Sequence, residues 1–324
     1  MTIGQHKRAR QAQGVAAARP LLPICYHVNR KLRQPVGGQQ TKRMPISSSS
    51  HHPLIAFMTD FGSGDGDVGV LKGVALGIVP QAQLVDITHE IAPQRVASAA
   101  WILSTVYRYF PAGTVFVCVI DPGVGSTRRA IALYAGDWYF VGPDNGLFSY
   151  IYAEQPVHSI VNLSNPAYHL TQVSSTFHGR DIFTPVGAHL ARGVPLEDIG
   201  ERLEPDSLIR LPLGIERHEN RIESSVVHID HFGNIITGIP LTLVPELFSQ
   251  PVQLHIPARS IMLTECRRFF SATDEANEAR PFIYGDSSGY IGVAIRNGNA
   301  ARTLGVAYGD TITLVIAERE SQFR

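Results

Sequence analysis

The stretch Val115-Phe-Val-Cys-Val-Ile-Asp-Pro-Gly-Val-Gly-Ser-Thr-Arg-Arg129 decides the fold of this chain. Its first six residues are apolar and rich in valine, the pattern of a strand that is buried on both faces of a sheet. The apolar run stops at Asp121, and the proline and glycines that follow predict a turn. Ligands of open α/β sheets bind at the carboxyl ends of strands. Asp121 and Arg128 therefore form a candidate charged site, although Asp121 could equally serve only to cap the turn.

The segments around this stretch alternate between strand and helix patterns. Short apolar runs rich in β-branched residues predict strands, and apolar residues at helical spacing predict helices between them. This order predicts an α/β domain with a doubly wound, mostly parallel sheet and right-handed crossovers. The other predicted strands are 54–58, 84–88, 130–134 and 138–141, and the predicted helices are 68–78 and 96–107.

Four aspartates are predicted to lie just past the ends of strands in this domain. A recurrent carboxylate at one edge of a sheet favours a ligand site there, although turn chemistry alone also favours aspartate in such positions. The four are Asp60, Asp86, Asp121 and Asp144.

The segment Ser175-Thr-Phe-His-Gly-Arg-Asp181 precedes a short predicted helix, which Thr184 would cap with Pro185 in its first position. His178 could be an ordinary loop histidine. The charged pair Arg180 and Asp181 lies beside it at the start of a helix. A role for His178 in a functional site is therefore an equally good interpretation.

Beyond about residue 215 the pattern changes to short alternating runs that are separated by turn residues, with no long helix. This pattern is typical of a small antiparallel barrel or sandwich. The predicted organisation is a basic extension over 1–52, an α/β N-terminal domain over 53–216 and a β-barrel C-terminal domain over 217–324. The predicted C-terminal strands are 222–229, 234–239, 252–256, 290–295 and 311–316.

Composition excludes several classes of function. A chain of 324 residues is longer than a single hydrophobic core usually stabilises, so two domains are expected. The first 50 residues hold nine Lys and Arg and no acid, which leaves 19 basic and 28 acidic residues in the remainder. An acidic body argues against a nucleic-acid partner. No apolar run approaches the ~20 residues that span a bilayer, so no membrane partner is expected.

Residues 1–52 are rich in Arg, Gln, Ser and Gly and show no sustained periodicity, so we expect them to be disordered. The segment resembles an organelle transit peptide, and it also resembles a tail from an over-long start assignment. The three cysteines lie far apart with no CxxC, which indicates a reducing compartment. The expected location is the cytoplasm, or an organelle if the extension is a transit peptide.

Other motifs give weaker indications. The run Gly123-Val-Gly-Ser126 lacks the GxxxxGK[ST] pattern of a phosphate loop. The loop 62–69 is rich in glycine but lacks the distal glutamate of a calcium loop, and it could be a backbone cradle or a plain surface loop. His228, Asp230 and His231 lack the further ligands that zinc requires, so no metal site is predicted.

Taken together, eight segments resemble the blocks of the S-adenosyl-L-methionine hydroxide adenosyltransferases, which are relatives of the bacterial fluorinase and chlorinase. The resemblance runs in order from about residue 54 to 316 and covers both predicted domains. The segments are Phe57-Met-Thr-Asp-Phe-Gly62, Asp86-Ile-Thr-His89, Phe110-Pro-Ala-Gly-Thr114, Asp121-Pro-Gly-Val-Gly125, Gly142-Pro-Asp-Asn-Gly-Leu147, Ser175-Thr-Phe-His-Gly-Arg-Asp181, Asp230-His-Phe-Gly-Asn234 and Asn297-Gly-Asn-Ala-Ala301.

The resemblance implies hydrolysis of S-adenosylmethionine to adenosine and L-methionine, with S-adenosylmethionine as the substrate and no cofactor. It also implies a homotrimer with active sites between subunits. The family's catalytic triad maps onto Asp121, Arg128 and His178. The halogenases carry a tyrosine in place of Asp121, which favours the hydroxide branch.

The resemblance also implies the substrate-binding residues. Asp60 would bind the ribose hydroxyls, Asp65 the methionine amino group and Asp230 the methionine end. Ser287 and Ser288 stand where some relatives place an arginine or a bulkier residue, so the contact with the methionine carboxylate stays unassigned. The remaining contacts to adenine and amino acid fall on Phe232, Asn234, Ser287, Asn297, Asn299 and Ala300.

Two other functions remain open. A halide could replace water and give a 5′-halo-5′-deoxyadenosine, but the carboxylate of Asp121 would repel an anion by several kcal/mol at low effective dielectric constant. The chain could also be a non-catalytic sensor of adenosine or S-adenosylmethionine that keeps Asp60 and Asn234 for binding.

Overall fold

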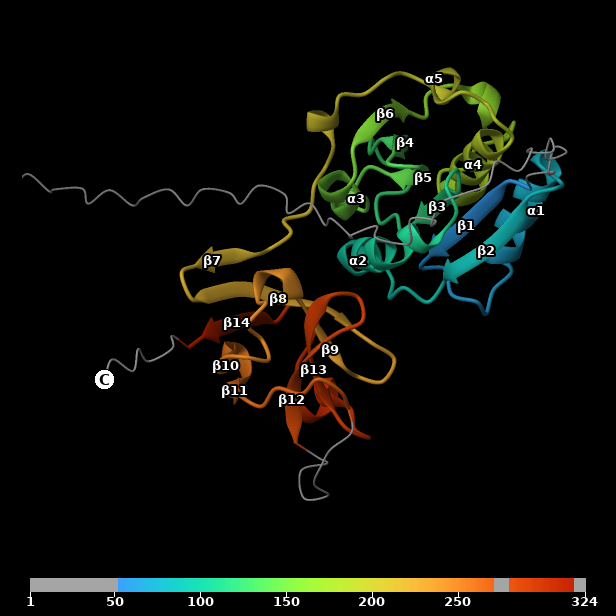
Figure 1. The fold of residues 1–324 in the computed structure, drawn as a ribbon. Coiled ribbons are helices and arrows are strands. Elements are labelled where there is room, and N and C mark those ends of the chain that lie inside the picture. The colour runs from blue at the N-terminus through green and yellow to red at the C-terminus, as the bar shows by residue number, and fades with distance from the viewer. Residues whose placement is uncertain (1–51, 271–279, 318–324) are drawn as a thin grey trace, which may run out of the picture.

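The computed structural model describes residues 52–270 and 280–317, which form two β-sheets that follow one another along the chain (Figure 1). The N-terminal sheet has six strands in the order β2-β1-β3-β5-β4-β6. The pairs β1–β2, β1–β3 and β3–β5 are parallel, whereas β4 is antiparallel to both β5 and β6. The strands are β1 (Leu54–Thr59), β2 (Gln83–Thr88), β3 (Val115–Val119), β4 (Ala130–Ala135), β5 (Trp138–Pro143) and β6 (Val157–Asn162).

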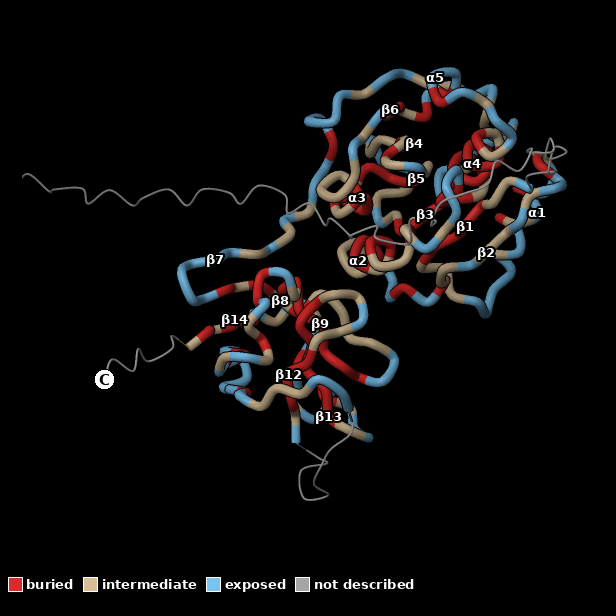
Figure 2. The backbone as a smooth tube through the Cα atoms, in the orientation of Figure 1, coloured by how far each residue is buried: buried red, intermediate tan, exposed pale blue. Residues whose placement is uncertain are grey.

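Helices cover both faces of this sheet, because each central strand is apolar on both sides. In β1, Ile55 and Phe57 pack with helices α1 and α4, whereas Ala56 and Met58 pack with α2 on the opposite face. Figure 2 shows these central strands as the buried part of the N-terminal half. The predicted doubly wound α/β fold is confirmed. The helices are α1 (Asp67–Ile78), α2 (Val96–Val106), α3 (Ser149–Glu154), α4 (Thr184–Ala191) and α5 (Leu196–Ile199).

Two local predictions were wrong. Asp86 lies inside β2, opposite Phe57 of β1, and not beyond the end of the strand. Thr184 does not cap a helix, because the π-helical turn η3 (Gly179–Phe183) runs directly into α4. The helical conformation begins earlier than the sequence pattern indicated. The buried Asp181 carboxylate accepts a hydrogen bond from the Ser174 backbone N–H, and this contact fixes the turn before α4.

The C-terminal sheet is antiparallel throughout its named strands and curls into a nearly closed barrel, as predicted. Its strand order is β11-β10-β14-β8-β9-β13-β12, with β7 added beside β8. Short alternating strands place their apolar side chains inside the barrel, where they form a core separate from that of the first sheet. The elements are β7 (Glu216–His218), β8 (Arg221–Ile229), β9 (Ile235–Pro240), β10 (Val252–Ile256), β11 (Ile261–Leu263), β12 (Pro281–Gly285), β13 (Tyr290–Ile295), α6 (Ala300–Leu304) and β14 (Thr311–Ile316).

An aromatic contact joins the two halves where α2 lies above the barrel (Figure 1). Trp101 of α2 stacks on His228 of β8 with ring centroids 4.7 Å apart, and Tyr290 packs edge-on against Trp101. Burial lowers the pKa of His228, so the ring is neutral in this contact at neutral pH.

Among the described residues, no helix combines the length and the apolar character that crossing a bilayer requires.

Candidate active site

The first cluster of charged side chains lies past the carboxyl end of β3, between β3 and η3. Arg128 Nε lies 2.9 Å from both carboxylate oxygens of Asp121, and Arg128 Nη2 donates to Asp121 Oδ2 as well. The same Nη2 lies 2.8 Å from His178 Nδ1. The side chains of Asp121 and Arg128 are only 5% and 10% exposed. The sequence-predicted triad is therefore one contiguous, mostly buried cluster.

The turn that follows β3 places this cluster because glycine allows a close backbone contact. Gly125 has φ of +76°, and a Cβ there would lie 2.3 Å from the Ser175 carbonyl oxygen. The turn can therefore pack directly on the segment that carries His178. On the other side, the Arg128 guanidinium lies 5.2 Å from the centre of the Phe183 ring, a cation–π contact that orients it.

The protonation state of His178 follows from its partners. A guanidinium only donates hydrogen bonds, so His178 Nδ1 must accept from Arg128. Burial, and then the charge of Arg128, lower the pKa of His178, whereas Asp121 and Asp181 act in the opposite direction. His178 is therefore a neutral imidazole at neutral pH, with its proton on Nε2.

A cavity of about 540 Å³ opens beside this cluster and includes both Asp121 and Asp60. Asp60 follows β1, and β1 lies between β2 and β3, so the cavity lies at the point where the strand order reverses and where such sheets bind ligands. Asp60 Oδ2 accepts from the Gln94 backbone N–H at 2.8 Å. Its other oxygen has no partner among the hydrogen bonds of the described residues and is available to a ligand.

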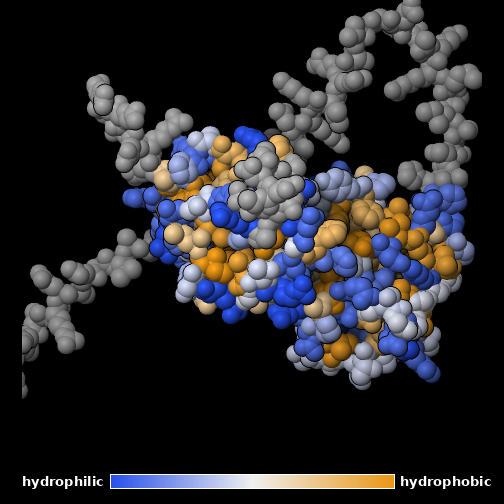
Figure 3. Space-filling model, turned by 90° about the horizontal axis from the view of Figure 1, so that it is seen from below, coloured by the Kyte–Doolittle hydropathy of each residue, from blue (hydrophilic) through white to orange (hydrophobic). Residues whose placement is uncertain are grey.

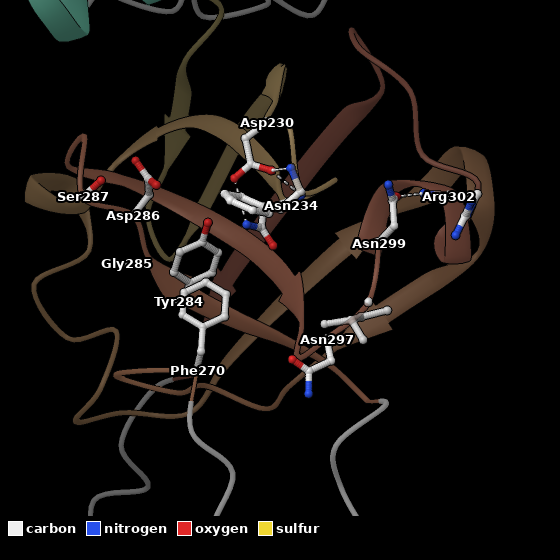
Figure 4. A pocket seen from close by; sticks show the side chains of 13 residues that line it. Asp230, Asn234, Phe270, Tyr284, Gly285, Asp286, Ser287, Asn297, Asn299 and Arg302 are labelled. Atoms are coloured by element: carbon white, nitrogen blue, oxygen red, sulfur yellow. Dashed lines mark hydrogen bonds between the residues drawn. The ribbon is translucent and has the colours of Figure 1, made fainter.

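A second cavity, of about 880 Å³, lies in the C-terminal barrel (Figure 4). It contains Asp230, Phe232, Asn234, Ser287, Asn297 and Asn299, all of which the sequence predicted as binding residues. Among the described residues, none lines both cavities.

The turn 230–234 organises this second cavity. Asp230 Oδ1 accepts from the backbone N–H groups of Phe232 and Asn234, and Asp230 Oδ2 accepts from Asn234 Nδ2 at 2.8 Å. Gly233, with φ of +85°, brings the turn so close to Asn299 that a Cβ would lie 2.1 Å from its side chain. Phe232, which is 74% exposed, lies on this fixed turn.

Two predicted binding residues lie elsewhere. Asp65 is exposed and lines neither cavity, whereas Asp67 at the start of α1 lines the first one. Ala300 is fully buried in the barrel core and can contribute only through its backbone. Each lies within two positions of a residue that lines a cavity, Asp67 in the first and Asn299 in the second.

Sequence reasoning missed several cavity residues. In the second cavity, Tyr284 and Asp286 are lining residues together with Ser287 (Figure 4). Burial raises the pKa of Tyr284, and the nearby Asp286 and Asp230 raise it further, so its phenol stays a hydrogen-bond donor. In the first cavity, Gln94 acts through its backbone, which no side-chain pattern reveals.

The described residues contain no group of three or more His, Cys, Asp or Glu side chains placed to hold a metal ion. His228 in particular stacks on Trp101 at the contact between the two halves.

Fold and site together define a class: a two-domain protein with a buried charged cluster beside a cavity at the switch point of an α/β sheet and a second cavity in a β-barrel. The chain belongs to the SAM hydroxide adenosyltransferase family. Residues 55–200 match the family's N-terminal domain, and residues 224–313 match its C-terminal domain.

Individual proteins extend this likeness over both domains. The chain is 40% identical to an (R)-S-adenosyl-L-methionine hydrolase of Salinispora arenicola over 262 residues, 80% of this chain and 97% of that protein. It is 27% identical to a fluorinase of Actinoplanes over 293 residues, 82% of this chain and 98% of the fluorinase. A crystal structure of an uncharacterised conserved protein from Thermotoga maritima superposes with a TM-score of 0.74 at 36% identity, and the match covers 81% of this chain and 99% of that one.

Proposed function

We propose that this protein hydrolyses S-adenosyl-L-methionine to adenosine and L-methionine, by attack of an activated water on the 5′ carbon of the ribose. The observation that carries the proposal is the buried cluster of Asp121, Arg128 and His178 beside a cavity that also holds Asp60. The name and the identity of the Salinispora arenicola relative support the same reaction.

The chemistry requires these residue types. The leaving group is a neutral thioether that departs from a sulfonium, so no general acid is needed. The site must instead align a water oxygen in line with the C5′–S bond at ~3–3.5 Å and must polarise that water, whose pKa in bulk is ~15.7. One water proton leaves as the C5′–O bond forms and the C5′–S bond breaks.

Within the cluster, we assign the proton to Asp121. His178 Nδ1 is occupied by Arg128, so that nitrogen is not free to accept from water. A carboxylate has about four lone-pair positions, and Asp121 Oδ1 makes only a shared contact with Arg128 Nε. Arg128 would hold the carboxylate and stabilise the negative charge that develops on the oxygen.

The remaining contacts would hold the substrate. Asp60 would accept from the ribose hydroxyls and Asn234 would offer a donor and an acceptor to an adenine edge. The ring of the exposed Phe232 would stack on an apolar or aromatic face. Asp65, which is exposed, would reach the methionine amino group only at the open rim.

We further propose that the protein is a homotrimer in which the first cavity of one copy faces the second cavity of the next. The two sets of binding residues lie in different cavities of one chain, which supports a site completed between copies. Figure 3 shows apolar surface gathered in patches on one face of the molecule. Contiguous exposed apolar patches are typical of contact surfaces.

The test is to incubate the protein with S-adenosylmethionine, with and without chloride, and to identify the products by chromatography. Because the relative's name specifies the (R) form, each sulfonium epimer is assayed separately. Adenosine and methionine as the products, both with and without chloride, support the proposal. A 5′-chloro product would identify a halogenase, and binding without any product would identify a sensor.

Substitution of Arg128 by lysine tests the role of the guanidinium. A lysine ammonium is a point charge and cannot hold Asp121 and His178 with one planar fork. We expect turnover to fall about 10²-fold, the loss of a well-placed electrostatic contact, with little change in adenosine affinity. Turnover equal to that of the wild type would remove Arg128 from the water site.

The lowered pKa of His178 predicts the pH dependence of turnover. Because its pKa is lowered, the imidazole stays neutral until the pH falls below its ordinary value of ~6.5. Protonation at Nδ1 would then place a donor against the Arg128 donor and break the cluster. We expect kcat to hold through pH 6.5 and to fall only at lower pH. An acidic limb centred above 6.5 would contradict this assignment.

A further inference from the structure

A second chain of coupled polar side chains lies beside the first cavity, at the ends of β1 and β2. Thr59 Oγ1 lies 2.8 Å from His89 Nδ1, and His89 Nε2 lies 3.1 Å from Asp86 Oδ1. Lys72 Nζ of α1 lies 2.6 Å from the other Asp86 oxygen. Thr59 is fully buried and His89 is 7% exposed. The triad of Asp121, Arg128 and His178 shares no residue with this chain.

The order carboxylate, imidazole, hydroxyl is that of a nucleophile triad, but the burial of Thr59 excludes that role. Its hydroxyl lines neither cavity, so no substrate can reach it. The same oxygen accepts the Phe61 backbone N–H at 3.3 Å. The chain therefore ends on the backbone of the turn that carries Asp60.

The Asp86 carboxylate orients the His89 ring. A carboxylate only accepts, so it attracts a proton on His89 Nε2, and His89 Nδ1 lies within hydrogen-bond distance of the Thr59 hydroxyl. His89 Nε2 makes no hydrogen bond of good geometry with Asp86, so the 3.1 Å contact orients the ring by electrostatic attraction. Lys72 holds Asp86 from the solvent side.

Other contacts tie the same two turns together. The Gly62 N–H donates to the His89 carbonyl at 2.8 Å, and Ser63 donates to Glu90 at 2.6 Å. The Gln94 N–H then holds one oxygen of Asp60. Asp60 thus sits between Thr59 and Phe61, both of which are anchored, and it lines the cavity.

We infer that the chain Asp86–His89–Thr59 positions Asp60 for the hydroxyl groups of the substrate's ribose. The inference rests on the proposed function, because it takes the ribose contact of Asp60 from it. Thr59 and His89 are positioning residues and do not touch the substrate. Their loss should weaken binding more than it slows the chemical step, since the triad of Asp121, Arg128 and His178 stays intact.

The test compares Thr59→Val, which keeps the shape and removes the hydroxyl, with Thr59→Ser, which keeps the hydroxyl. We expect Thr59→Val to raise the dissociation constant of adenosine, measured by calorimetry, and the KM for S-adenosylmethionine, each about tenfold. The value of kcat should change less than KM, and Thr59→Ser should restore both constants. If Thr59→Val does not fold, Asp86→Asn replaces it, with an expected rise of about threefold.

Two controls separate positioning from general stability. Thr114→Val removes a buried hydroxyl at the amino end of β3, far along the sheet from the cavity, and should lower thermal stability without a change in KM. The double variant Thr59→Val/Asp60→Asn should bind adenosine no more weakly than Asp60→Asn alone, because both changes act through one carboxylate.

Additive losses in the double variant, or a Thr59→Val protein with wild-type adenosine affinity, would overturn the inference. A wild-type protein that fails to turn over S-adenosylmethionine would instead overturn the proposed function. Calorimetry with adenosine needs no turnover, so the two failures are distinguishable.

Discussion

Substitution of Asp121 by asparagine should lower kcat by about 10²- to 10⁴-fold, the range for loss of a positioned general base. Asparagine keeps the shape of the side chain and one acceptor oxygen, but it cannot take the water proton. It also leaves Arg128, which is 10% exposed, without a counter-charge. Adenosine should still bind, because Asp60 and the turn 230–234 are untouched. Stopped-flow or product assays give kcat, and calorimetry gives the affinity.

The neighbouring arginine supplies a matched control for this prediction. Arg129 donates to Asp144 through both Nε and Nη2, and Asp144 is almost completely buried, yet the pair lines neither cavity. Asp144→Asn breaks an equivalent ion pair and should lower the melting temperature while kcat stays near the wild-type value. If both variants lost turnover to the same degree, the effect of Asp121 would be one of stability and the proposed base would be wrong.

Much of the fold could be predicted because the local patterns and the tertiary structure agree. The valine-rich run that ends at Asp121 reads as a strand buried on both faces, and β3 is buried at every position. The turn chemistry of Gly123 and Gly125 correctly placed Asp121 at the edge of the sheet. Asp86 lies within β2, inside the predicted strand 84–88, because a strand at the edge of its sheet tolerates a charged residue in its interior, here paired with Lys72.

The site itself could be predicted only in part. Side-chain types and spacing identified Asp121 and Arg128, whose contact is local, but the approach of His178 depends on the packing of η3 on a distant turn. Backbone groups such as the Gln94 N–H leave no trace in composition, and Gln94 has φ of +65°, which is unusual for a residue other than glycine. Asp67 was missed for a related reason, since Asp65 and Asp67 in one loop are equivalent until the loop is folded.

The division of the binding residues between two cavities leads to the second large effect. In a ring of three copies, each site would pair the first cavity of one copy with the second cavity of the next. Asp121→Asn damages only the first cavity, and Asn234→Ala damages only the second. Each homotrimer should be nearly inactive at substrate concentrations well below KM. Co-expression with two different affinity tags, followed by purification through both, isolates rings that contain both variants.

Any such mixed ring contains one junction at which an intact first cavity meets an intact second cavity, whichever variant is in the majority. The mixed rings should therefore recover about a third of wild-type activity per ring, one site of three. Sites contained within single copies would give no recovery, because every copy carries one damaged cavity. The control mixes the single variant Asp121→Asn with the double variant Asp121→Asn/Asn234→Ala. None of the junctions in this mixture joins two intact cavities, so its activity should stay at background. Recovery in the first mixture and none in the second would show that neighbouring copies share the site, and sedimentation analysis of the same samples gives the number of copies per ring.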